Sequence, residues 1–328
     1  MNLLTNALKG AAMGIAEIIP GVSGGTIAFI SGIYERLLLS IKAFNPSLIG
    51  IYKKGGLAAI WKAIDGRFLF SLLGGMVVGL LFGLVVITHL MESHPEPLWG
   101  FFFGLIIASV FLIVKEIPKW NLSLFIALII GAAVAYTITV VSPAEGSTSL
   151  IYVFFSGMLA ISALMLPGIS GSFVLLLLGM YAYIIHTLKD FLTAPDLQKF
   201  IVIAVFATGC LVGLAGFSRI LTWLFKKYQY PTLAAMVGFL LGSLNKIWPW
   251  RNITSIADKA TGTITKIADP STIAGLDKET YKIITEQNVM PAEYLMSEPK
   301  TMLTVIAMIL GLSVVFIITA ISNKLSKS

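Results

Sequence analysis

Long apolar runs, separated by short polar turns, occupy most of this sequence. Six of them are long enough for an α-helix that crosses a hydrocarbon core of about 30 Å, which takes about 20 residues. They lie at residues 68–90, 98–114, 122–141, 200–224, 232–248 and 302–322. The pattern therefore predicts an all-α membrane protein that crosses the bilayer several times.

Two further apolar segments are interrupted near their middle by proline and glycine. In the first, a helical arm over residues 10–19 spans only about 15 Å before the break, and the returning arm is apolar only as far as Ile33. Each arm is too short to cross the core, so we predict two re-entrant hairpins, over residues 7–44 and 151–189. The expected helix breaks are at Pro20, Gly21, Pro167 and Gly168.

The two hairpins belong to an internal repeat that covers nearly the whole chain. The 35 residues from Gly10 align with those from Gly157 at an offset of 147, with ten identities. Residues 68–109 align at an offset of 134, and a last stretch from Ile126 aligns at 180. We therefore expect two copies of one unit, residues 1–141 and residues 150–322.

The repeat predicts an inverted topology. With a hairpin that returns to the side it came from, each copy makes three crossings, and the odd number turns the second copy over. Cytoplasmic loops carry an excess of Lys and Arg, so the orientation that keeps the basic turns inside places both termini in the cytoplasm. Those basic residues are Lys53, Lys54, Lys62, Arg67, Lys115, Lys119, Lys226, Lys227, Lys324 and Lys327.

The stretch over residues 251–300 is the one soluble-looking part of the sequence. We expect it to be a small extracytoplasmic loop, with short helical pieces near "DKETYKIITEQN". Just before it, Trp248 and Trp250 are typical of an aromatic belt at the membrane surface.

Composition agrees with a membrane protein, because 57% of the 328 residues are hydrophobic and 12% are charged. The net charge of +7 is spread over the loops, so membrane lipids rather than a nucleic acid are the expected surroundings. The sequence has no histidine and carboxylate cluster with metal-ligand spacing and no nucleotide-binding motif, so we expect no metal and no cofactor. The lone Cys210 excludes an intrachain disulfide.

The helix breaks predict a binding site for an anion. Free backbone groups inside a membrane are tolerated only where protein or a water-filled cavity satisfies them. A helix that restarts after a break presents N–H groups and a positive dipole end, and nearby hydroxyls add donors. A single Pro-Gly kink usually only bends a helix, but Pro-Gly-x-Ser-Gly recurs in both copies. The expected phosphate ligands are Ser23, Gly24, Gly25, Thr26, Ser170, Gly171 and Ser172.

Charged residues near the hairpins have two interpretations each. Glu17, three residues before the first break, could gate the site or couple it to protons, or could bond to the hairpin backbone. Arg219 could bind phosphate or extend toward the membrane surface. Arg36 and Arg67 lie at the expected cytoplasmic rim, where they could release a headgroup or anchor the protein.

Glycines at helical spacing predict close helix packing rather than a site. They are Gly75, Gly79 and Gly83 in the first copy and Gly209 and Gly213 in the second.

The segments "GIAEIIPGVSGGTIAFISGIYERLL", "PGISGSFVLLLLGMY" and "FSRILTWL" resemble those of the bacterial polyprenyl-phosphate transporter family called PopT. The resemblance covers residues 1–322 apart from the loop. It implies a lipid flippase, not an enzyme, that returns undecaprenyl phosphate from the outer to the inner leaflet of the cytoplasmic membrane for cell-wall biogenesis. It does not determine whether the protein forms a homo-oligomer. The family's motif positions fall on Glu17, Pro20, Gly21, Ser23, Gly24, Gly25, Thr26, Pro167, Gly168, Ser170, Gly171, Ser172 and Arg219.

Two other classes of function stay open on the sequence. A channel or exchanger for a small anion would also use opposed helix N-termini. An intramembrane serine hydrolase would use Ser23, which stands in a G-x-S-x-G string, although that motif needs a preceding strand and a neighbouring base.

Overall fold

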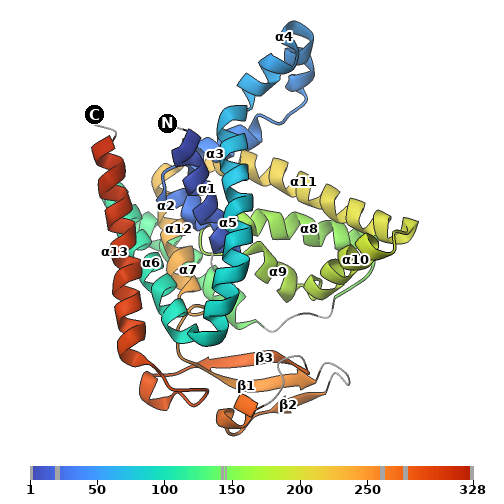
Figure 1. The fold of residues 1–328 in the computed structure, drawn as a ribbon. Coiled ribbons are helices and arrows are strands. Elements are labelled where there is room, and N and C mark those ends of the chain that lie inside the picture. The colour runs from blue at the N-terminus through green and yellow to red at the C-terminus, as the bar shows by residue number, and fades with distance from the viewer. Residues whose placement is uncertain are drawn as a thin grey trace.

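The computed structural model describes residues 3–18, 23–141, 144, 146–258, 263–275 and 280–325. Most of these residues are helical, and a small sheet lies at the end of the molecule opposite the two termini (Figure 1). The helices of the first half are α1 (Leu3–Glu17), α2 (Gly24–Ile30), α3 (Tyr34–Lys42), α4 (Ser47–Ala63), α5 (Gly66–Ser93), α6 (Pro95–Glu116) and α7 (Leu122–Val140). Those of the second half are α8 (Leu150–Leu164), α9 (Gly171–Leu177), α10 (Tyr181–Thr193), α11 (Leu197–Lys227), α12 (Gln229–Ser243) and α13 (Thr301–Leu325).

Four helices of the described chain, α5, α6, α7 and α11, are long and apolar enough to cross a membrane. A fifth span results if α9 and α10, which meet at a bend of 107°, count as one. Large apolar side chains such as Val77, Phe82 and Val85 on α5 are exposed, as on a surface that faces lipid. The protein is therefore a polytopic membrane protein. Because α12 has 15 residues, a crossing over residues 232–248 stays a prediction.

Side-chain caps explain where several of these helices begin. The side chain of Asn121 accepts a hydrogen bond from the Leu124 N–H, Ser149 accepts one from Tyr152, and Asp196 accepts one from Lys199. Each of these caps satisfies a backbone donor that the first turn of a helix leaves free.

The predicted glycines pack helices at backbone contact. A Cβ added to Gly75 of α5 would lie 2.0 Å from the Ala7 carbonyl oxygen of α1. In the second half, a Cβ on Gly209 of α11 would lie 2.1 Å from the Phe154 oxygen of α8. The prediction of packing faces is confirmed, and the two contacts are equivalent under the repeat offsets of 134 and 147.

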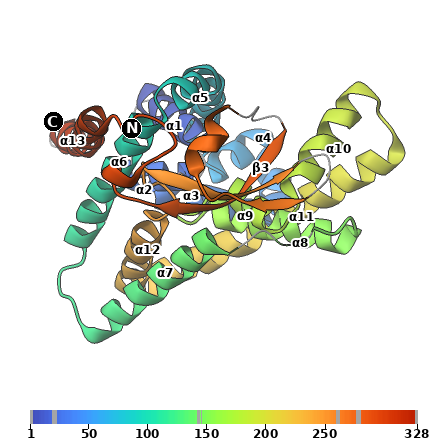
Figure 2. The same cartoon turned by 90° about the horizontal axis from the view of Figure 1, so that it is seen from below.

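The remaining long helices pair across the two halves. Helix α6 packs on α13, where a Cβ on Gly104 would lie 1.9 Å from the Met308 oxygen. Helix α12 packs on α7, where a Cβ on Gly238 would lie 2.1 Å from the Leu128 oxygen. These two contacts are again equivalent in the repeat, so each half contributes one helix to a pair with the other half. Figure 2 shows α7 and α12 lying together, away from α13.

The expectation of a purely α-helical fold is wrong for the loop region. Three strands, β1 (Arg251–Asp258), β2 (Ile264–Lys266) and β3 (Tyr281–Asn288), form an antiparallel sheet in the order β2-β1-β3. The expected helix near "DKETYKIITEQN" is mostly strand β3, because the β-branched Ile283, Ile284 and Thr285 favour a pleated, half-buried surface.

The sheet region is fastened to the helices. The indole N–H of Trp250 donates to the Pro299 oxygen and that of Trp248 to the Val289 oxygen, both at 2.8 Å. Trp250 is buried, so it is a docking residue and the expected aromatic belt is wrong for it. Buried Glu96 of α6 accepts hydrogen bonds from Tyr294 at 2.9 Å and Ser297 at 2.6 Å.

Candidate functional site

The two interrupted hairpins meet in the interior of the protein. The Ser23 hydroxyl donates to the Leu164 oxygen at the end of α8, at 3.1 Å. The N–H of Gly168, in the second break, donates to the Thr26 hydroxyl at 2.9 Å. These hydrogen bonds join segments more than 140 residues apart, so the residues expected to form one site from two copies are neighbours.

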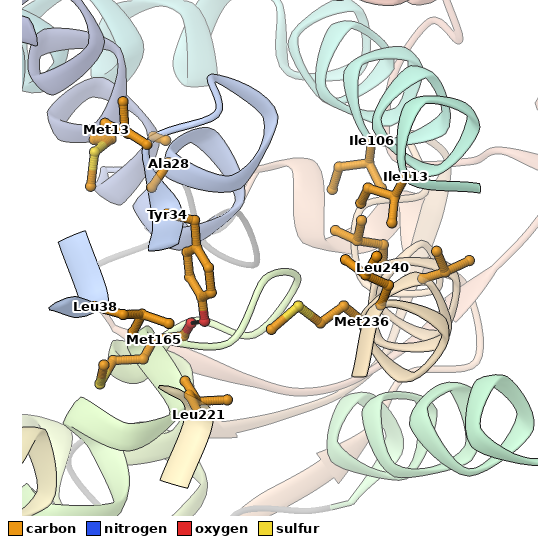
Figure 3. Close-up of a cluster of buried hydrophobic side chains, with 14 of the residues drawn as sticks. Met13, Ala28, Tyr34, Leu38, Ile106, Ile113, Met165, Leu221, Met236 and Leu240 are labelled. Carbon is orange, nitrogen blue, oxygen red and sulfur yellow. Dashed lines mark hydrogen bonds between the residues drawn. The ribbon is translucent and has the colours of Figure 1, made fainter. Parts of the chain in front are cut away.

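A buried tyrosine completes this junction. The Tyr34 hydroxyl donates to the Met165 oxygen, and its ring lies between Met13 and Ala28 on one side and Leu221 on the other (Figure 3). Sequence reasoning missed Tyr34 as a site residue. The sequence did contain a signal, because the repeat alignment at an offset of 147 places a tyrosine in both copies, Tyr34 and Tyr181.

The start of α2 is already occupied by protein groups. Ser23 caps the helix and accepts from the Gly25 N–H at 3.1 Å, and a Glu17 carboxylate oxygen accepts from the Gly24 N–H at 2.7 Å. Ser23 and Thr26 are fully buried. The Glu17 carboxyl group therefore stands where an anion would meet these backbone donors, and this contact agrees with the interpretation in which Glu17 bonds to the hairpin backbone.

The second break differs from the first at the start of its helix. Its chain turns at Pro167 and at Gly168, whose φ of +84° suits glycine, and Ser170 precedes Gly171 at the start of α9. Ser170 and Ser172 share a hydrogen bond of 2.8 Å between their hydroxyls, and Ser172 is exposed. Within the described chain, the Ser170 side chain does not cap α9, which distinguishes this break from the first.

Ser170 lines a small cavity of about 10 Å³, room for about one water. The cavity walls also include Thr139, Gly168, Phe173, Ser243 and Lys246. Lys246 is a second residue that sequence reasoning missed. Its signal was a lysine at the expected extracytoplasmic end of the 232–248 run, against the charge bias of membrane proteins.

A larger pocket, of about 260 Å³, lies where α3 meets the end of α11. It is lined by Glu35, Leu38, Leu39, Thr222, Phe225, Lys226 and Gln229. Its lining combines one lysine, one glutamate and two neutral polar residues with apolar walls, so it suits an amphipathic molecule.

The predicted arginines do not gather at the breaks in this conformation. Arg219 is exposed and donates to the Ala215 oxygen of its own helix at 2.8 Å. Arg36 pairs with Asp65 at 2.6 Å and lies 4.3 Å from the centre of the Phe68 ring. Arg67 is exposed. Pro20 and Gly21 lie outside the described residues.

The geometry of Ser23 favours binding or structure over nucleophilic chemistry. A serine nucleophile gives its proton to a neighbouring base, whereas the Ser23 proton is directed to a backbone carbonyl.

Comparison with known proteins identifies the family. A model of the undecaprenyl phosphate translocase-like family (VCA0040-like) matches residues 13–265. The chain belongs to this family. It is 42% identical to a polyprenyl-phosphate transporter of Vibrio cholerae serotype O1, over 95% of this chain and 96% of that protein. It is 33% identical to a polyprenyl-phosphate transporter of Staphylococcus aureus, over 74% of this chain and 86% of that protein.

No solved structure matches this member of the translocase-like family. The matched range spans both hairpin breaks, β1 and the greater part of β2. The junction described above therefore lies wholly within the part of the chain that defines the family.

Proposed function

We propose that this protein carries undecaprenyl phosphate from the outer to the inner leaflet of the bacterial cytoplasmic membrane and so recycles the lipid for cell-envelope synthesis. The observation that carries the proposal is the 42% identity, over nearly both full chains, to a polyprenyl-phosphate transporter. The helix breaks provide a chemical rationale, because they collect hydroxyls and backbone donors of the kind that bind phosphate.

The proposed topology has two inverted repeats with both termini in the cytoplasm. Two observations support it. The glycine contacts of α1 with α5 recur in α8 with α11, as expected for two copies of one unit. The termini lie at the end of the molecule opposite the sheet (Figure 1), and Lys226 lines one pocket with Glu35 of α3.

In the proposed path, the lipid phosphate arrives on the sheet side near Ser170 and Ser172. It then passes the junction of the two breaks, where it displaces the Glu17 carboxylate from the Gly24 N–H. Displacement fits the chemistry, because the phosphate and the Glu17 carboxyl group both offer oxygens that accept from the same backbone N–H. The phosphate leaves through the Lys226 pocket toward Arg36 and Arg67, and Arg219 assists from α11.

The lipid tail never needs to leave hydrocarbon along this path. The exposed apolar side of α5 and the apolar walls of the pocket beside α11 offer it a continuous apolar environment. Alternating access would follow from a rocking movement that opens one break while the other closes.

The experiment is inward movement of a labelled polyprenyl phosphate in proteoliposomes, with and without a pH gradient. We expect wild type to move the lipid, and Glu17→Gln to lose any gradient dependence, because glutamine keeps an oxygen for the Gly24 N–H but carries no charge. Arg219→Ala should slow movement, with Arg67→Ala as a comparison at the rim.

A parallel measurement of chloride and phosphate flux separates the competing class. If wild-type protein passes small anions but moves no lipid, the flippase proposal is wrong and the breaks belong to an anion pathway. If Arg219→Ala moves lipid at the wild-type rate, Arg219 is not on the path.

A further inference from the structure

Lys246 connects the sheet to the second helix break. Its ammonium lies 3.0 Å from a carboxylate oxygen of Glu286 on β3, and 5.4 Å from the ring centre of Phe173 on α9. It also lines the small cavity that contains Ser170. Lys246 therefore contacts the Glu286 carboxylate and lies in the same cavity wall as Ser170 of the second break.

The Glu286 carboxylate is shared between two cations. Arg251 donates to the same oxygen at 2.9 Å, and its guanidinium lies 4.7 Å from the ring centre of Trp99. Although burial acts to raise the pKa of Glu286, Arg251 and Lys246 hold that pKa below its usual range, so the carboxylate is ionised at neutral pH. Two positive charges and one negative charge leave this group with a surplus positive charge beside the cavity.

The two cations are not held equally. The Arg251 side chain is 12% exposed and stacked on an indole, whereas the Lys246 side chain is 26% exposed on a flexible four-carbon stem. If Lys246 leaves Glu286, Arg251 still pairs with the carboxylate. The lysine can therefore change partners without leaving an uncompensated charge on the sheet.

We propose that Lys246 is the first phosphate ligand at the sheet-side mouth of the second break, and that Glu286 occupies its place until the lipid phosphate displaces it. The inference rests on the proposed function and adds to it the residue that captures the headgroup. A phosphate monoester carries about −1.5 to −2 charges near neutral pH and has three acceptor oxygens, so it competes well with one carboxylate. Ser170 and Ser172 donate to the remaining oxygens.

The present cavity is too small for a phosphate, so the structure corresponds to the closed mouth. Lys246 contacts both Phe173 of α9 and Glu286 of β3, so its release from Glu286 removes this link between the two elements. Capture of the headgroup and opening of the mouth are then one event.

The test is the apparent KM for polyprenyl phosphate in the proteoliposome assay. Lys246→Gln should raise KM by about tenfold or more, since a charge-assisted hydrogen bond is lost. Glu286→Gln should lower KM, since the competitor is removed, and Lys246→Arg should keep KM near wild type. Lys199→Gln is the matched control, because Lys199 also pairs with a carboxylate, at 2.8 Å, and is similarly exposed at 30%.

Opposite effects of Lys246→Gln and Glu286→Gln support the inference, because a merely structural ion pair would shift both variants the same way. The inference is wrong if the KM values of Lys246→Gln and Glu286→Gln shift in the same direction, or if Lys246→Gln leaves KM unchanged. The proposed function still stands in either case. A wild type that moves no lipid overturns the proposed function itself. If Lys246→Gln does not fold, binding of dodecyl phosphate in detergent to Glu286→Gln and Lys246→Arg decides: weaker binding by Glu286→Gln than by wild type rejects the competition.

Discussion

Two adjacent glycines on α5 allow a sharp test of the helix packing. A Cβ added to Gly75 would lie 2.0 Å from the Ala7 oxygen, about 1.4 Å inside the 3.4 Å of ordinary contact. A Cβ added to Gly74 meets no described atom within 4 Å. The same substitution to alanine should therefore have opposite effects at the two positions.

The magnitudes follow from the two environments. Gly74→Ala should stabilise the protein by about 1 kcal/mol, which is the difference in helix propensity. Gly75→Ala gains the same propensity but forces α1 away from α5, and overpacking of this kind costs about 1–3 kcal/mol or more. Because the clash is with backbone atoms, a change of rotamer cannot relieve it.

The assay is unfolding of purified protein in detergent, followed by circular dichroism as a denaturing detergent is added. We expect Gly74→Ala to unfold at a higher denaturant fraction than wild type and Gly75→Ala at a lower one. Equal shifts for both variants would show that α1 and α5 do not touch along this face, and the packing argument would be refuted.

Three further predictions concern the junction and the sheet. Tyr34→Phe should destabilise the protein by about 1–3 kcal/mol, because the buried Met165 oxygen loses its donor; an unchanged unfolding midpoint in detergent would contradict this. Ser23→Ala should cost about 1 kcal/mol or more through loss of the α2 cap and of the donor to the Leu164 oxygen, and Ser23→Thr, which keeps the hydroxyl, should recover part of that loss in the same assay. The lowered pKa of Glu286 stabilises the folded sheet at neutral pH, and this contribution should disappear as the pH falls below about 4.5; hydrogen exchange of β1 and β3 should show lost protection there, and less pH dependence in Glu286→Gln.

Length and polarity alone predicted most of the helices. An apolar run of about 20 residues in a membrane has few alternatives to a helix, so α5, α6, α7 and α11 were predictable. The glycine spacing also predicted close packing, but not which helix meets which. A glycine face such as that of Gly104 fits any small surface, and its pairing with Met308 depends on the whole assembly.

The sheet was harder to foresee because its signals conflict. The segment around β3 contains Lys282 and Glu286, which are common in helices, next to the β-branched Ile283 and Ile284. The contacts with β1 decide the conformation, and the sequence of β3 by itself does not contain them.

The sequence predicted that the two helix breaks meet, but not the hydrogen bonds between them. Recurrence of Pro-Gly-x-Ser-Gly identified Ser23 and Ser170, yet the Leu164 and Met165 oxygens that bind Ser23 and Tyr34 have no sequence signature. Backbone acceptors are the same in every residue. Lys246 was missed for a similar reason, because its role depends on Glu286, which approaches it only when the sheet folds.

The pairing of α6 with α13 and of α7 with α12 affects the order in which the helices can pack during synthesis. During synthesis, α6 and α7 leave the ribosome long before their partners exist. Their glycine faces then meet only lipid or the insertion machinery, neither of which reproduces the close packing at Gly104, where an added Cβ would lie 1.9 Å from the Met308 oxygen. The packing of α6 is completed only when α13 inserts beside it. A chain that lacks α13 therefore keeps the glycine face of α6 without its partner helix, and such an incompletely packed intermediate is prone to misassembly.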